Sequence, residues 1–131
     1  MNAQAPAGLA PILLIEDEPS VTAFLRAALE RHGYAVANAA TGAEGLSMLN
    51  GGRYSGVISD IRMPGAVNGA EVHAWIQKNR PELCARIILI SGDTANSETQ
   101  TFLAQSRAPC IEKPFRVQQL MAIVEKTFGK P

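Results

Sequence analysis

The sequence lacks an excess of charge of either sign and lacks any long apolar run. Lys and Arg together number 12, Asp and Glu also number 12, and the formal net charge is zero. The basic residues form no block of the kind that favours nucleic acid, so we expect no direct binding of nucleic acid. No apolar run approaches the roughly 20 residues that span a bilayer, so we expect no membrane segment.

Cysteine is scarce, and a targeting signal is missing. The two cysteines, Cys84 and Cys110, lack metal-ligand spacing and lie among apolar residues, as buried free thiols usually do. Free thiols are typical of a reducing compartment, so we expect a cytoplasmic protein. The chain begins without a basic residue ahead of an apolar core, and residues 1–9 are expected to be a short flexible tail.

The remaining length suits one domain, expected over residues 10–131, because 47% of the 131 residues are hydrophobic. Short apolar segments alternate five times with segments of helical periodicity. This alternation predicts parallel β-α-β units with right-handed crossovers, and hence an α/β fold with a helix-covered sheet. The expected strands are residues 12–15, 34–38, 56–59, 87–90 and 108–112.

The first helix is expected to begin at Pro19 and to stop before Gly33. Its apolar residues recur at three- and four-residue spacing, which predicts one buried face. His32 and His73 lie in helical segments with no acid or cysteine at ligand spacing, and we interpret both as surface residues. The expected buried face of the first helix consists of Val21, Phe24, Leu25, Ala28 and Leu29.

Thr41 and Asn68 are the expected caps of the second and third helices. The fourth helix, residues 95–106, is polar, with Phe102 and Leu103 as its only large apolar anchors, so we expect it to be the least firmly docked. The other expected apolar contacts are Leu46 and Leu49 in the second helix, Val72, Trp75 and Ile76 in the third, and Val117, Leu120, Met121, Val124 and Phe128 in the last.

Asp60 directly follows the third expected strand, and a Met-Pro-Gly loop comes after it. Ligands bind at the carboxyl ends of the strands in open α/β sheets, so an acid at this point is a candidate for chemistry. From this stretch alone, a carboxylate that merely caps the loop is an equally good interpretation. However, four more polar residues follow other strands in the same way, and a parallel sheet would place all of them along one edge: Glu16, Asp17, Ser91 and Lys113.

Three clustered carboxylates repel one another, and a hard divalent cation with oxygen ligands relieves that repulsion. Mg²⁺ fits best, because it keeps several waters and can bridge a phosphoryl oxygen. The hydroxyl of Ser91 and the ammonium of Lys113 could take the remaining phosphoryl oxygens, with Asp60 as the nucleophile. Taken singly, Lys113 would be a surface lysine and Ser91 a cap, and only their placement beside the acids favours a functional interpretation.

At these residues the sequence resembles the receiver domain of two-component response regulators. Glu16-Asp17 is similar to the family's acidic pair, Asp60 to its phosphoacceptor, Ser91 to its hydroxyl residue, and Lys113-Pro114-Phe115 to its lysine-proline turn. The resemblance covers residues 10–128. It implies a three-layer, doubly wound, flavodoxin-like fold with five parallel strands in order 2-1-3-4-5 and a cis Lys113–Pro114 bond.

The resemblance also implies a function. Asp60 would accept a phosphoryl group from a histidine kinase or a histidine phosphotransfer protein, with Asp60, Lys113 and Ser91 as the catalytic residues. The Mg²⁺ set would be Glu16, Asp17, Asp60 and Arg62, with Asp17 in the direct role and Glu16 in a water-mediated one. The protein would be no enzyme beyond its own phosphoryl transfer and dephosphorylation. Its partner surface would be the fourth helix, fifth strand and fifth helix.

The sequence departs from the family pattern at three places. The acid pair is Glu-Asp instead of two aspartates, and the loop after Pro64 is one residue longer than the usual form. Cys110 stands where the family usually has an aromatic ring that swings inward on activation. A thiol cannot make that movement, so we expect the readout to rest on displacement of the fourth helix and its loop.

Two alternatives stay open beside the signalling switch. A hydrolase that uses Asp60 as a transient nucleophile would need a second acid or base, commonly two residues beyond, but that residue is Arg62. A degenerate receiver that works without phosphorylation is the other. No effector domain follows Pro131, so we expect either a stand-alone receiver or a piece of a larger chain such as a hybrid kinase, whose own kinase would then be a possible in-chain partner beside a downstream protein target.

Overall fold

The computed structural model describes residues 10–63, 65 and 67–131. The predicted tail at residues 1–9 and part of the longer loop after Pro64 lie outside these residues. Within them, five parallel strands form one sheet in the order β2-β1-β3-β4-β5, which confirms the predicted topology. The strands are β1 (Ile12–Ile15), β2 (Val36–Ala39), β3 (Gly56–Asp60), β4 (Ile87–Ser91) and β5 (Cys110–Glu112).

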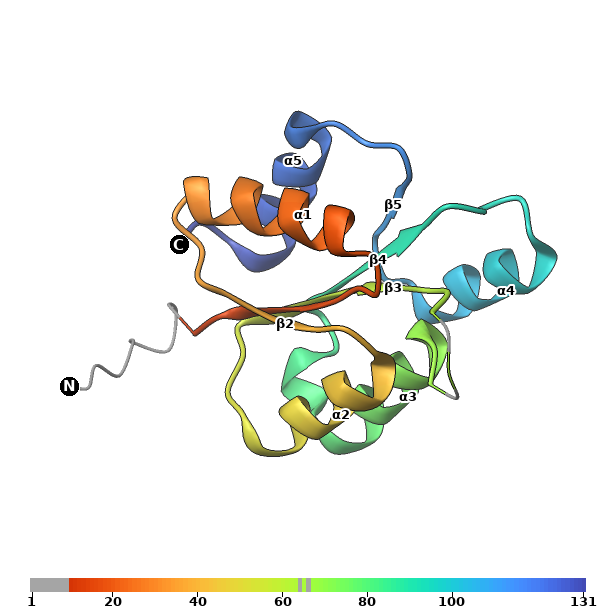
Figure 1. Ribbon diagram of the computed structural model, residues 1–131. Helices are drawn as coiled ribbons and strands as arrows, with labels where there is room; N and C mark the ends of the chain where they lie inside the picture. The colour runs from red at the N-terminus through yellow and green to blue at the C-terminus, as the bar shows by residue number, and fades with distance from the viewer. Residues whose placement is uncertain (1–9, 64, 66) are drawn as a thin grey trace.

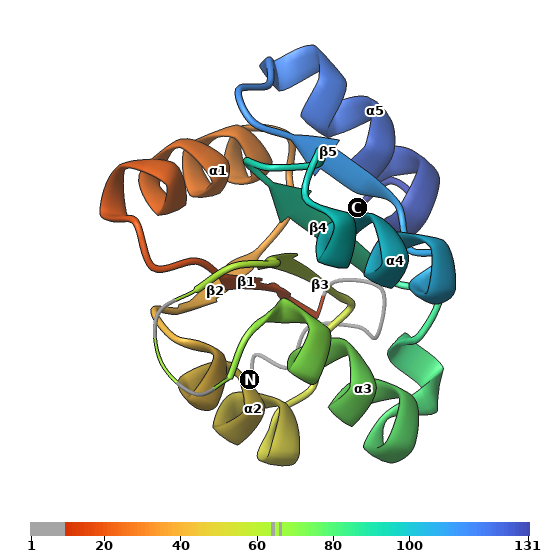
Figure 2. The same cartoon turned by 90° about the vertical axis from the view of Figure 1, so that its right-hand side faces the viewer.

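Helices cover both faces of the sheet (Figure 1). α1 (Pro19–Arg31) and α5 (Val117–Phe128) lie on one face, and α2 (Gly42–Gly51) and α3 (Gly69–Asn79) lie on the other. α4 (Ser97–Ser106) follows β4 and packs beside α3 (Figure 2). A short 3₁₀ helix, η2 (Pro81–Leu83), leads into β4. The right-handed crossovers of parallel strands require this three-layer arrangement.

The central strands are apolar on both faces because both faces are covered. Every residue of β1, β3 and β4 is buried. The side chains of Ile12 and Leu14 join the core beneath α1 and α5, whereas Leu13 and Ile15 join the core beneath α2 and α3. The alternation along a strand thus divides one apolar run between two cores.

Local sequence signals fix the helix ends. Thr41 caps α2 by accepting a hydrogen bond from the Glu44 amide, as predicted. Asn68 and Glu71 form a reciprocal capping box at the start of α3, which confirms the other predicted cap. The Lys113–Pro114 peptide bond is cis, also as predicted.

Two predicted burial states are wrong. Phe24, assigned to the buried face of α1, is 40% exposed and packs its ring against Phe115 beyond the end of β5. His73, interpreted as a surface residue, is only 5% exposed. Its position on α3 faces α4, and Phe102 of that helix covers the imidazole. Helical periodicity alone did not reveal this contact, because it joins two separate helices.

α4 is held by few buried side chains, as predicted. Of its residues only Thr99 is buried, while Phe102 and Leu103 are half-buried against the core. The helix begins at Ser97 instead of residue 95, because Asn96 caps it through two amide hydrogen bonds. β2 and β5 are also shorter than predicted, since Tyr34 and Ala108 lie before the strands. None of the helices in the described part of the chain is long and apolar enough to span a membrane.

Candidate functional site

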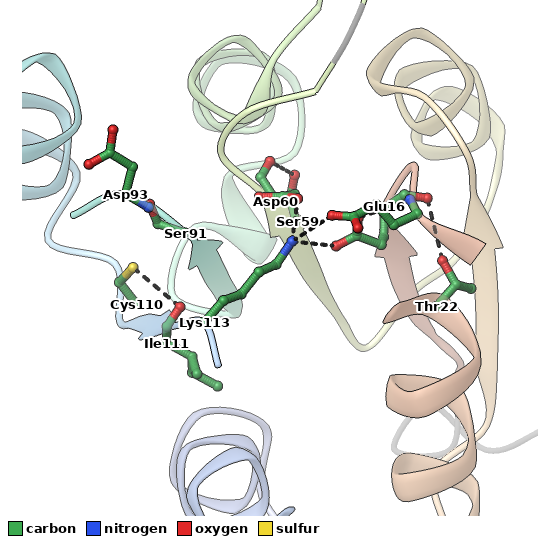
Figure 3. A network of polar contacts seen from close by, with 10 residues as sticks. Glu16, Thr22, Ser59, Asp60, Ser91, Asp93, Cys110, Ile111 and Lys113 are labelled. Carbon is green, nitrogen blue, oxygen red and sulfur yellow. Dashed lines mark hydrogen bonds and ion pairs between the residues drawn. The ribbon is translucent and has the colours of Figure 1, made fainter. Parts of the chain in front are cut away.

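The carboxyl ends of β1, β3, β4 and β5 bring the predicted polar residues to one edge of the sheet. Glu16 follows β1, Asp60 ends β3, Ser91 ends β4 and Lys113 follows β5 (Figure 3). Asp60 is only 5% exposed although it terminates its strand. This burial makes its charge costly unless a neighbouring positive charge offsets it.

Gly69 allows α3 to approach Asp60 closely. A Cβ atom at Gly69 would lie 2.5 Å from the carbonyl oxygen of Asp60 and 2.7 Å from Cα of Ile61. The Gly69 amide donates a hydrogen bond to the Ile61 carbonyl, at 2.8 Å. Any side chain at this position would therefore push the start of α3 away from the end of β3.

The three acids form one cluster, because carboxylate oxygens of Glu16, Asp17 and Asp60 all lie within 4.8 Å of one another. Burial raises the pKa of Glu16 to about 7, and the charge of Asp60 adds to that rise although the Glu18 amide opposes it. Glu16 Oε1 is buried and accepts no hydrogen bond from the described residues. A buried carboxylate oxygen that accepts no hydrogen bond and lies beside two more acids belongs to a donor set that fits a hard divalent cation such as Mg²⁺.

Lys113 supplies the positive charge of the site. Its Nζ lies 3.0 Å from Asp60 Oδ2, 3.5 Å from Glu16 Oε1 and 3.4 Å from Glu18 Oε1. Desolvation lowers the pKa of Lys113, but the hydrogen bond and charge of Asp60 outweigh it and raise the pKa overall. Glu18 was not among the predicted site residues; its place in the acidic run Glu16-Asp17-Glu18 was the only sequence signal for it.

Ser91 lies at the same edge but does not contact Asp60. Its Oγ accepts a hydrogen bond from the Asp93 amide at 3.1 Å, so the hydroxyl is bound within its own loop. The Ser91 carbonyl accepts from the Lys113 amide at 2.8 Å, which ties the ends of β4 and β5 together. In Figure 3 Ser91 stands apart from the cluster around Lys113.

Arg62, predicted as part of the metal set, lies outside the acid cluster. It is exposed and lines a cleft between α3 and α4 together with Asn68 and Glu98. A guanidinium has no lone pair to offer a metal, so a ligand from this position would have to be its backbone carbonyl. That role remains a prediction.

The loop after β4 is tied to β5 near Cys110. The Thr94 hydroxyl donates a hydrogen bond to the Glu112 carboxylate, and Gln100 of α4 donates to the Thr94 carbonyl. Cys110 is half-buried, and burial raises the pKa of its thiol. Both cysteines are free, as predicted. The thiol of Cys110 donates to the Ile111 carbonyl, and it is too small to sweep between a buried and an exposed position as an aromatic ring could.

One groove formed by the described residues is remote from the acids. It has a volume of about 750 Å³ and runs between α1 and α5, from Phe24 and Val117 to His32 and Glu125. None of Asp60, Ser91 and Lys113 is among its described lining residues. The candidate site is therefore an open edge of the sheet and not the floor of this groove.

The sequence of this chain matches the family model of the response regulator receiver domain over residues 12–125. The chain therefore belongs to the response regulator receiver domain family. This assignment agrees with the five-stranded topology and with the acids at the strand ends. Receiver domains of this family are signalling domains of two-component systems.

Two relatives show the range of proteins in which such a domain occurs. The sensor kinase CckA of Brucella abortus is 31% identical over 125 residues, which are 94% of this chain and 13% of CckA. The response regulator receiver protein CpdR of Brucella abortus is 32% identical over 115 residues, 88% of this chain and 93% of CpdR. The chain spans less than half the length of several other curated relatives.

A solved structure of the same fold includes a metal complex. The response regulator protein TrrA of Thermotoga maritima was solved in complex with Mg²⁺-BeF. It is 33% identical to this chain with a TM-score of 0.77, and the match covers 90% of this chain and 98% of TrrA. The likeness extends over almost all of both chains.

Proposed function

We propose that this receiver accepts a phosphoryl group on Asp60 from a phosphohistidine of a sensor histidine kinase or a histidine phosphotransfer protein, and that it then binds a partner differently. The observation that carries the proposal is the 3.0 Å contact of Lys113 Nζ with Asp60 Oδ2, beside the carboxylates of Glu16 and Asp17. The relationship to CckA, a sensor kinase, supports a kinase as the phosphodonor. The two free cysteines support a reducing, cytoplasmic location.

Asp60 acts as the nucleophile. One oxygen of its carboxylate attacks the phosphorus, and the new O–P bond forms while the N–P bond of the phosphohistidine breaks. The electron pair of the broken bond stays on the imidazole nitrogen of the donor. A carboxylate nucleophile attacks through an oxygen that bears no proton, so the transfer needs no general base, and an arginine at position 62 does not hinder it.

The surrounding residues offset the charge of the transferred group. Glu16, Asp17 and Asp60 would hold Mg²⁺, which when bound neutralises the acids and the phosphoryl oxygens. Once Asp60 is phosphorylated, Lys113 pairs with a phosphoryl oxygen instead of with the free carboxylate. Ser91 donates its hydroxyl to another oxygen, and to do so it gives up its present hydrogen bond from the Asp93 amide.

The output follows from the covalent link between Ser91 and the loop that precedes α4. When Ser91 moves toward Asp60, Thr94 has to move as well, and its hydrogen bond to Glu112 is strained. α4, with a single buried residue, is the element that can respond at the lowest cost. We therefore place the partner surface on α4, β5 and α5, for a downstream protein or for a kinase in the same chain.

A hydrolase is the weaker proposal for this site. Hydrolysis of a separate substrate needs a pocket for that substrate and a base that activates water. The apolar groove between α1 and α5 does not reach Asp60, and Lys113, the nearest titratable side chain opposite the acids, is held protonated. Slow attack of water on phosphorylated Asp60 would serve only to reset the switch.

The test is labelling with a small phosphodonor that contains an N–P bond. Phosphoramidate and Mg²⁺ are added to the wild type and to two variants, Asp60→Asn and Asp93→Asn, and intact masses are recorded. Asp93 is an exposed acid close to the site and serves as the matched control. We expect the wild type and Asp93→Asn to gain one phosphoryl mass and Asp60→Asn to gain none. No labelling of the wild type, by this donor or by any histidine kinase, would favour a degenerate receiver.

A further inference from the structure

α3 and α4 are in contact through the imidazole of His73, an ionisable group that the phosphorylation chemistry does not use. His73 of α3 is 5% exposed, and its imidazole packs edge-on against the ring of Phe102, with centroids 5.6 Å apart and planes at 85°. No hydrogen bond or ion pair joins His73 to any described residue. The contact is therefore an aromatic one, between the imidazole of His73 and the ring of Phe102.

This contact involves one of the two large apolar side chains of α4. Thr99 is the only fully buried residue of that helix, and Phe102 and Leu103 are its large apolar side chains. Thr94 donates a hydrogen bond to Glu112 in the loop before the helix, and the one hydrogen bond from α4 to Thr94, donated by Gln100, is exposed to solvent. α4 thus contacts α3 through a histidine, the residue type whose unperturbed pKa, about 6.5, lies nearest to neutral pH.

The charges around His73 do not stabilise its protonated form. The charged side chains on the surrounding elements are Glu71 and Lys78 on α3, Glu98 on α4 and Arg62 after β3. Glu71 is engaged in the capping box with Asn68. Burial lowers the pKa of His73, and no neighbouring charge contributes to this shift.

We propose that His73 is a proton-sensitive lock on α4. Neutral His73 holds α4 through Phe102, and protonation of its ring releases α4 from α3. A buried imidazolium without an acceptor is unfavourable, so the protonated side chain is stable only where α4 has moved aside and water reaches the ring. Release of α4 and uptake of one proton are then linked, and each promotes the other.

The direction in which the docking of α4 changes with pH follows from that linkage. The docked state binds the proton more weakly than the released state, so docking is fully favoured above the ordinary histidine pKa of about 6.5 and is lost as pH falls below it. One proton limits the effect to about tenfold in the docking equilibrium per pH unit. If α4 carries the output of phosphorylation, as proposed above, acid would move it in the same direction as phosphorylation does.

The test uses the unphosphorylated full chain, so its outcome does not depend on the role of Asp60. Hydrogen exchange of residues 97–106 is measured at pH 5.5 and 7.5 and corrected for the intrinsic pH dependence of exchange. We expect protection of α4 to fall at the lower pH in the wild type. His73→Phe keeps an aromatic ring against Phe102 but cannot titrate, so its α4 protection should be the same at both pH values. His32→Gln, which removes the exposed histidine, should behave as the wild type.

A second measurement needs no change at His73. The imidazole of His73 is titrated by NMR in the wild type and in Phe102→Ala. We expect the pKa of His73 to be below 6.5 in the wild type and to rise in the variant, where α4 has lost its contact. Equal pH dependence of α4 protection in the wild type and His73→Phe would overturn the proposal. A wild-type His73 pKa at or above 6.5 would overturn it as well.

Discussion

The ammonium of Lys113 and the carboxylate of Asp60 are paired at 3.0 Å although the residues lie 53 positions apart and their strands are separated by β4. The same ammonium also lies within 3.5 Å of Glu16 and Glu18. Lys113 is thus the positive charge that makes an acidic cluster tolerable at this edge. A metal ion bound to these acids would be attracted to the same carboxylates as the ammonium of Lys113. The lysine and the metal would therefore compete electrostatically.

Lys113→Met should therefore tighten the binding of Mg²⁺ while it impairs phosphorylation. The variant keeps an unbranched apolar stem but removes a positive charge beside Asp60, which favours a cation by about 1 kcal/mol at a partly exposed site. Calorimetric titration with Mg²⁺ measures the affinity, and labelling with phosphoramidate measures the transfer. Lys126→Met, at an exposed position on α5, is the control. Unchanged affinity and unchanged labelling would show that Lys113 is an ordinary surface lysine with no role in metal binding or phosphorylation.

The raised pKa of Glu16 predicts how stability depends on pH without metal. Because the pKa is about 7 in the folded protein and 4.5 in the reference state, folding favours the protonated form. Protonated Glu16 therefore stabilises the folded state by roughly 3 kcal/mol. This stabilisation is fully present below pH 4.5 and is lost as pH rises through 7. Urea unfolding in EDTA at pH 5 and 8 measures it.

The comparison with Glu16→Gln isolates this group from the other carboxylates. The variant should lose less stability between pH 5 and 8 than the wild type does. Glu30→Gln, at an exposed position on α1, should retain the wild-type loss. Addition of Mg²⁺ should stabilise the wild type more at pH 8 than at pH 5, because the proton and the metal compete for the acids. A parallel pH dependence in the wild type and Glu16→Gln would contradict the raised pKa.

The topology and the acid cluster were predictable from the sequence because each rests on a local pattern. The apolar runs end in Glu16 and Asp60, and parallel strands bring such ends together. The role of Glu18 and the burial of His73 were not predictable in this way. Both depend on a side chain from a distant element, Lys113 in one case and Phe102 in the other, whose approach no local periodicity specifies. Phe24 was assigned to the core by its spacing, but the groove between α1 and α5 leaves it exposed.

Gly69 should be intolerant of any side chain. In Gly69→Ala the new methyl group would collide with the backbone of Asp60 and Ile61, which cannot move without displacing the end of β3. We expect a loss of about 1–3 kcal/mol in the free energy of unfolding. Gly51→Ala is the control, because no atom lies within 4 Å of that Cβ position and alanine favours the helix. Urea denaturation of both variants should therefore shift in opposite directions.

Arg107 ends α4 in a left-handed conformation, with φ of 58°, and its amide closes the helix on the Leu103 carbonyl. Glycine adopts this conformation without steric strain, so Arg107→Gly should stabilise the protein by about 0.5–1 kcal/mol. Ala104→Gly, within the same helix, should destabilise it by about 1 kcal/mol. A loss of stability in Arg107→Gly, measured by thermal unfolding, would show that the arginine side chain contributes more than the strain costs.

The last prediction concerns the route by which phosphorylation reaches α4. Movement of Ser91 toward Asp60 has to pass through Thr94, whose hydroxyl is bound to Glu112, and the side chain at Cys110 is too small to report the change. Phosphorylation should therefore increase hydrogen exchange most strongly between residues 91 and 106. Thr94→Val removes the hydrogen bond to Glu112 but keeps the size of the side chain, so exchange in that segment should already be raised before phosphorylation. Cys110→Ala should leave both the exchange response and partner binding close to those of the wild type. If Cys110→Ala instead abolishes partner binding while exchange from 91 to 106 stays flat on phosphorylation, the side chain at 110 is the switch.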